Sequence, residues 1–215
     1  MLDLNFSQRM ARYQIILDNA SIEEIAIVLA MYGYSAQKII DILTLFKEVH
    51  KLTSLQAEEY GDKLEATEAY QSRFNKAYKS YMRLRKIARL LFEDDLEARS
   101  TLWLHKEKPN TYNKLFSTAS VFYDNMLKNE DYLTVMTEMN CSDRVIGEAH
   151  NDLKEMILTK ENQLKEAGQA QKATLKRDET METLDEQMSR LVRVCEIAFE
   201  DDPQIMEQLG FVVKA

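Results

Sequence analysis

The sequence predicts an all-α protein, and composition and apolar spacing are the observations that predict it. The chain of 215 residues contains only five Gly and two Pro. Sheet proteins need Gly, Asn-Gly and Pro in their turns, so this scarcity disfavours strands. Apolar residues instead recur at alternating spacings of three and four over long stretches, which is the period of a helix that faces a partner as in a coiled coil.

The second half of the chain repeats the first at a shift of 107 positions. Phe92-Glu93-Asp94-Asp95 matches Phe199-Glu200-Asp201-Asp202, and Arg83-Leu84 matches Arg190-Leu191 without a gap between the two registers. Accidental alignment of two helical segments is the alternative. The matches predict two tandem, pseudo-symmetric four-helix units over residues 1–107 and 108–215, which could also pack as one compact domain.

Heptad spacing indicates which faces of the longest segments are buried. In the first half the expected core positions are Ile39, Ile42, Phe46, Val49, Tyr70, Phe74, Ala77, Tyr81, Leu84, Ala88 and Leu91. Their counterparts begin with Ile146, Ala149, Leu153 and Met156. We expect the two long helices of each half to form an antiparallel hairpin that turns near Gly61 or Gly168. One very long helix through each glycine is the alternative, because an interior glycine costs only about 1 kcal/mol.

Capping residues mark the expected helix starts. Ser21 and Glu24 have the spacing of a capping box, and Ser35, Ser142 and Asn129 are further expected N-caps. Asp95 and Asp202 are each expected to cap a following helix, with Pro203 in the first helical position. Gly33 and Asn140 suit the left-handed backbone that ends a preceding helix.

Charge and cysteine content limit the classes of partner and the cellular compartment that we expect for this protein. The formal net charge of −8 disfavours nucleic acid and anionic membranes as partners. No apolar run is long enough to cross a membrane, and the N-terminus lacks the pattern of a secretion signal. Two cysteines do not form a disulfide framework, so we expect a cytoplasmic protein.

Catalytic and metal-binding patterns are not found in the sequence. None of His50, His105 and His150 has a Glu three residues before it, as a di-metal helical bundle would require. Cys195 falls on an apolar stripe and reads as an inert thiol, and Cys141 has no evident histidine partner. We therefore predict no catalytic, cofactor-binding or metal-ligating residue, no cofactor, and no enzymatic activity.

A cluster of cations is the strongest candidate site. Arg83, Arg85, Lys86 and Arg89 lie within seven residues and are expected on outer faces of a long helix. A solvated face paired with nearby acids is one interpretation, and a docking face for an acidic protein is the other. The sequence thus favours a non-enzymatic helical interaction or scaffold protein with a protein partner. A homo-oligomer is also compatible with the sequence. The alternative is a metal-binding or enzymatic bundle with carboxylate ligands.

Overall fold

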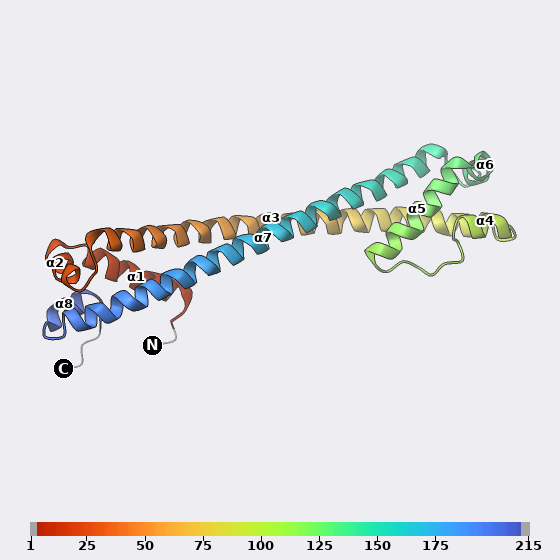
Figure 1. The fold of residues 1–215 in the computed structure, drawn as a ribbon. Coiled ribbons are helices and arrows are strands. Elements are labelled where there is room, and N and C mark those ends of the chain that lie inside the picture. Colours follow the sequence, from red (N-terminus) through yellow and green to blue (C-terminus); the bar gives the residue numbers. More distant parts are fainter. Residues whose placement is uncertain (1–3, 212–215) are drawn as a thin grey trace. The chain divides into compact units, whose positions relative to one another are not determined.

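The computed structural model describes residues 4–211, and its regular structure there is entirely helical (Figure 1). Eight helices occur in this range: α1 (Phe6–Ala20), α2 (Glu23–Met31), α3 (Ala36–Leu91), α4 (Leu96–Thr101), α5 (Tyr112–Lys128), α6 (Glu130–Thr137), α7 (Asp143–Ala198) and α8 (Pro203–Gln208). The absence of strands between residues 4 and 211 confirms the predicted all-α class.

The long helices α3 and α7 do not fold back at their glycines. Each helix runs without a break for 56 residues, through Gly61 in α3 and through Gly168 in α7. The predicted antiparallel hairpins are therefore wrong, and the very long helix is correct. Neither glycine has the positive φ that a turn would require, in contrast to Gly33 at φ +82°. The cost of about 1 kcal/mol per helical glycine is small beside the apolar stripe that continues on both sides.

The chain divides into two compact units, and each unit draws on both halves of the sequence. Unit 1 takes residues from 1–59 and 170–215, and unit 2 is the continuous segment 60–169. Unit 1 thus combines α1, α2 and the first part of α3 with the last part of α7 and α8. The boundary at residues 107 and 108 describes a repeat in the sequence and stays a prediction.

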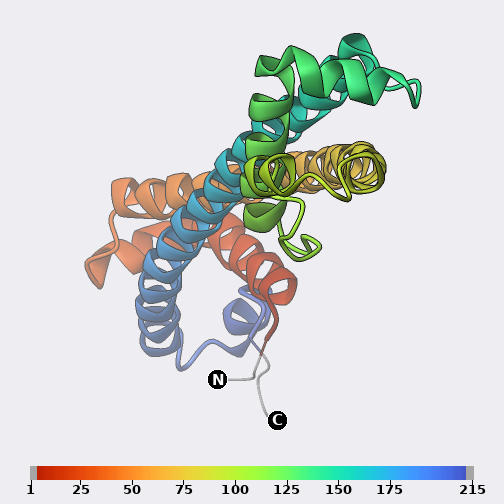
Figure 2. The same ribbon diagram turned by 90° about the vertical axis from the view of Figure 1, so that its right-hand side faces the viewer.

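The core of unit 1 joins residues from the two ends of the chain. The expected stripe of Ile39, Ile42, Phe46 and Val49 on α3 is buried. It belongs to one apolar cluster with Ile16 and Leu17 of α1, Ile25 and Leu29 of α2, and Leu184, Met188 and Leu191 of α7. Figure 1 and Figure 2 both show α1 and α8 beside these parts of the two long helices.

The core of unit 2 is built in the same manner from the other parts of the long helices. The expected stripes on α3 and α7 supply Ala77, Tyr81, Leu84, Ala88, Ile146, Ala149, Leu153 and Met156, all of them buried. Helix α5 adds Leu115, Phe122 and Tyr123, which have no exposed surface. The ring of Tyr81 meets that of Phe122 edge-on at 5.6 Å between centroids.

Most predicted helix ends are confirmed. Asp95, Asn129 and Asp202 each accept a hydrogen bond from a backbone N–H at the start of their helices, and Pro203 occupies the first turn of α8. The capping box at Ser21 is wrong, because its hydroxyl donates instead to the carbonyl oxygen of Leu17 at the end of α1. A capping box that sequence reasoning missed lies at Asn5 and Gln8.

Among residues 4–211, no single helix is both long and apolar enough to cross a membrane. Helix α2 and α3 pass that test only when taken together, as a pair bent by 109°.

Candidate functional site

Three of the four cations predicted to form a docking face lie on the surface of unit 2. Arg83, Lys86 and Arg89 are exposed at the C-terminal end of α3. Within residues 4–211 none of the three forms an ion pair or a side-chain hydrogen bond. Spacings of three residues place them along one side of the helix. We call these three residues the basic ridge.

Arg85 does not belong to this surface, which corrects the fourth predicted residue. Only 3% of Arg85 is exposed, and its guanidinium donates hydrogen bonds to the backbone carbonyls of Leu104 and Lys106. The reason is helical geometry: Arg85 follows Tyr81 by four residues and precedes Ala88 by three, so it shares the buried stripe. That spacing was readable in the sequence, although the positive charge suggested a surface position.

The buried guanidinium fastens the segment after α4 to α3. The carbonyls that it binds come shortly after Trp103, which has a left-handed backbone with φ +51°. Lys106 places its ammonium 5.3 Å from the centroid of the Trp103 ring. The Nε atom of Arg85 has no hydrogen-bond partner among the described residues. Arg85 therefore acts as a structural anchor beneath the basic ridge.

Exposed apolar side chains adjoin the basic ridge. Leu90, next to Arg89, is 61% exposed, and Leu96 at the start of α4 is 80% exposed. Both line a shallow hollow together with Leu91 and the acids Glu93, Asp94 and Asp95. The surface thus presents cations first, and then leucines that lie beside three acids.

The corresponding surface of unit 1 is less basic. At a shift of 107 positions, Arg190 and Arg193 on α7 stand for Arg83 and Lys86, and Ile197 stands for Leu90 with a similar exposure of 62%. Arg89 is replaced by Glu196, and the exposed Lys79 of unit 2 is replaced by Glu186. Acids therefore alternate with the cations in unit 1, whereas unit 2 presents cations alone at these positions.

Burial favours the neutral forms of Cys195 in unit 1 and of His150 and Tyr123 in unit 2. Burial raises the pKa of the Cys195 thiol to about 12, which opposes its ionisation. Burial, and the positive charge of Lys154, lower the pKa of His150, while Asp124 acts in the opposite direction. The His150 ring stacks on Tyr123 at 5.4 Å between centroids, in a packing role. Burial raises the pKa of Tyr123 as well. These directions favour structure over proton transfer at neutral pH.

No protein-family model matches the sequence, and neither a curated protein nor a solved structure shows significant similarity to it. The surfaces and cavities of the two units therefore supply the functional argument.

Proposed function

We propose that the chain is a non-enzymatic, cytoplasmic interaction protein that docks an acidic segment of another protein on the basic ridge of unit 2. The observation that carries this proposal is three exposed cations without an ion pair among residues 4–211, in a chain with a net charge of −8. Acids outnumber cations in this chain, so its cations have many acids with which they could pair. A ridge whose cations form no ion pairs within the described residues is available to the acids of a partner.

The chemistry of the ridge favours a protein segment over nucleic acid. Counterion release from nucleic acid requires many phosphate contacts, and three cations within an acidic chain supply few. The adjacent Leu90 and Leu96 add apolar surface that the apolar face of an amphipathic segment can cover, provided that its acids lie over the ridge and away from Glu93, Asp94 and Asp95. Electrostatic attraction would bring the partner to the ridge, and burial of the leucines would hold it there.

We also propose that the chain arose by duplication into two pseudo-symmetric units. The bounds of α3 and α7 correspond at a shift of 107 positions, and so do the starts of α2 and α6. Two hydrogen bonds support this as well: Gln56 donates to Thr174 in unit 1 and Gln163 donates to Thr67 in unit 2, at the same separation of 3.5 Å. Gln163 is the counterpart of Gln56 and Thr174 is the counterpart of Thr67 at a shift of 107 positions, so the two hydrogen bonds join equivalent residues.

Charge reversal on the ridge tests the docking proposal. The variant Arg83→Glu, Lys86→Glu, Arg89→Glu should reduce capture of acidic partners in a quantitative pull-down at least tenfold, with unchanged helical circular dichroism. The matched control is Arg190→Glu, Arg193→Glu in unit 1, which should retain capture. Equal capture by the triple variant and the unmodified chain would reject the proposal, as would loss of capture in the control alone.

A further inference from the structure

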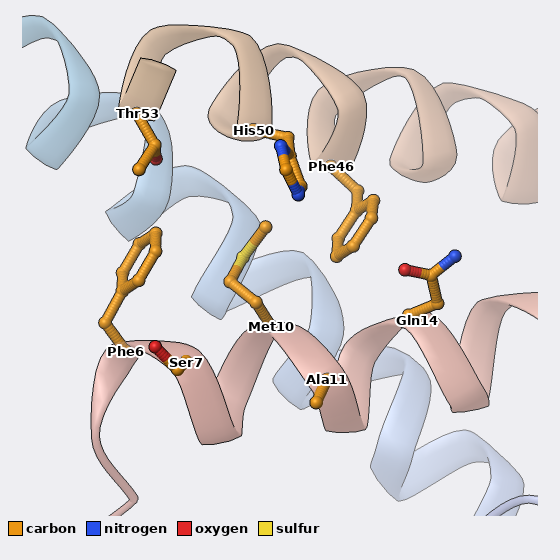
Figure 3. Close-up of a pocket in the computed structure, with 8 residues that line it drawn as sticks. All are labelled: Phe6, Ser7, Met10, Ala11, Gln14, Phe46, His50 and Thr53. Atoms are coloured by element: carbon orange, nitrogen blue, oxygen red, sulfur yellow. The ribbon is translucent and has the colours of Figure 1, made fainter. Parts of the chain in front are cut away.

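A pocket lies between α1 and α3 in unit 1, away from the basic ridge residues (Figure 3). Its volume is about 300 Å³, which is the lower end of the range of about 300–1,000 Å³ typical of ligand pockets. The lining residues are Phe6, Ser7, Met10, Ala11, Gln14, Phe46, His50 and Thr53. A space of this size fits a small molecule of one ring and few substituents.

Apolar side chains from both helices form the body of the pocket. Phe46 descends from α3, while Phe6 and Met10 rise from α1 (Figure 3). Met10 and Phe46 are buried in the unit 1 core, so their positions are fixed by packing. A thioether beside aromatic rings makes a favourable surface for another aromatic or alicyclic ring.

Polar side chains with free hydrogen-bonding capacity stand around this apolar body. Ser7, Gln14 and His50 are exposed, and none of their side chains has a hydrogen-bond partner among residues 4–211. The Thr53 hydroxyl donates to the carbonyl of Val49, which leaves its oxygen able to accept. No Asp, Glu, Lys or Arg lines the pocket. The lining therefore complements an uncharged molecule that can both donate and accept hydrogen bonds.

Unit 2 carries bulkier side chains at several of the corresponding positions, although Leu153 stands for Phe46 there. Helix α5 matches α1 at a shift of 106 positions, so Tyr112 stands for Phe6 and Phe116 for Met10. At the shift of 107 positions that relates the long helices, Ile157 stands for His50 and Lys160 for Thr53. The rings of Tyr112 and Phe116 stack at 6.2 Å, and Lys160 lies 4.7 Å from the centroid of Tyr70. The space between α1 and α3 in unit 1 therefore depends on the side chains at these positions as well as on the placement of the helices.

We propose that this pocket binds a small uncharged ligand with an aromatic or alicyclic ring and an amide or alcohol group. The ring lies against Phe6, Met10 and Phe46. The polar group exchanges hydrogen bonds with His50 and Gln14, whose donors and acceptors are otherwise open to water. This binding site is independent of the basic ridge and of the proposed protein partner.

Methyl NMR of the full chain, with benzamide as the probe, tests the proposal. Addition of benzamide should shift the Met10 methyl signal in a saturable manner, with a Kd on the order of 1 mM as expected for so small a ligand. The buried Met126 and Met156 of unit 2 serve as internal controls whose signals should not move. Benzoate, which carries a charge on a similar frame, should shift Met10 at least fivefold less at equal concentration.

Two substitutions at the exposed Ala11 make a matched pair for the same titration. Ala11→Trp places a large side chain in the pocket and should abolish the Met10 shift. Ala11→Ser keeps the space open, carries the residue found at Ser117 of unit 2, and should preserve the shift. His50→Ile should weaken binding at least threefold by removing the imidazole. The proposal fails if Met10 does not respond, if Met126 responds equally, or if Ala11→Trp binds like the unmodified chain.

Discussion

Unit 1 and unit 2 solve the same packing problem with different side chains. In unit 2, Tyr70, Tyr112 and Phe116 form a continuous set of aromatic contacts beside the core. In unit 1 the position of Tyr70 is held by Arg177, whose guanidinium lies 5.8 Å from the centroid of Phe6 and donates to Gln56. Unit 1 thereby exchanges aromatic filling for polar contacts and retains an open pocket. On the outer face of its long helix, unit 2 carries the basic ridge where unit 1 has alternating acids and cations.

A second difference concerns what ties the helices together. In unit 1, Asp185 of α7 pairs with Arg9 and accepts a hydrogen bond from Tyr13 at 2.7 Å, which joins α7 to α1. At the position of Asp185, unit 2 has Tyr78, which stacks on Phe74 with ring centroids 6.3 Å apart. The two units therefore differ mainly outside the apolar stripes that they share, because most stripe positions are buried in both units.

The largest effect on folding is expected from cutting the chain between the two sequence repeats, residues 1–107 and 108–215. Because each unit contains parts of both, fragments 1–107 and 108–215 should each lack a complete core and lose most of their helical signal as separate monomers. Mixed or co-expressed, they should associate in a one-to-one ratio and recover the circular dichroism of the intact chain. The cut between Glu107 and Lys108 falls in an exposed segment. A fully helical monomer of either fragment alone would contradict this expectation.

A medium effect is expected at Arg85, whose position in unit 1 is taken by Val192. Arg85→Ala removes both hydrogen bonds to the segment after α4 and should lower the free energy of unfolding by about 1–3 kcal/mol. The only tryptophan of the chain, Trp103, lies in that segment, so its fluorescence should shift to longer wavelength as the segment loosens. The control Arg83→Ala, at an exposed position, should change stability by less than about 0.5 kcal/mol. Equal behaviour of the two variants would show that Arg85 is not an anchor.

The smallest effect is a pH dependence of stability that arises from His150 in unit 2. The lowered pKa of His150 means that the folded state prefers the neutral ring. Stability from this group is therefore complete above the unfolded value of about 6.5 and is lost as the pH falls through the folded value. His150→Leu, which copies Leu43 of unit 1, should flatten the urea midpoint between pH 7 and pH 5. An unchanged pH profile in this variant would rule out the contribution.

Most of the stripe positions were predictable from the sequence because burial imposes a helical period, although Tyr70, Phe74 and Leu91 are only partly buried. Ile39, Val49, Ala88 and Met156 all lie where the spacing placed them. The continuity of α3 was not predictable from Gly61, since a helical glycine and a turn glycine look the same without knowledge of what packs on either side. Arg85 was misplaced for a similar reason: residue type favoured the surface, and only its spacing from Tyr81 indicated the core.

The capping box at Ser21 shows the limit of short motifs. A serine hydroxyl can accept from a following N–H group or donate to a preceding carbonyl, and that of Ser21 donates to the carbonyl oxygen of Leu17 at the end of α1. The pocket could not be predicted at all. Its residues are ordinary helix positions of α1 and α3, and nothing in their spacing indicates that the space between the two helices is left open.

The division of the chain also sets an order of assembly during synthesis. Unit 2 is one uninterrupted stretch, so its helices can collapse as soon as residue 169 has left the ribosome. Unit 1 must wait, because Arg9 meets Asp185 across 176 positions of chain. Its first 59 residues are therefore the part of a nascent chain that stays longest without its partners, and the part most exposed to chaperones.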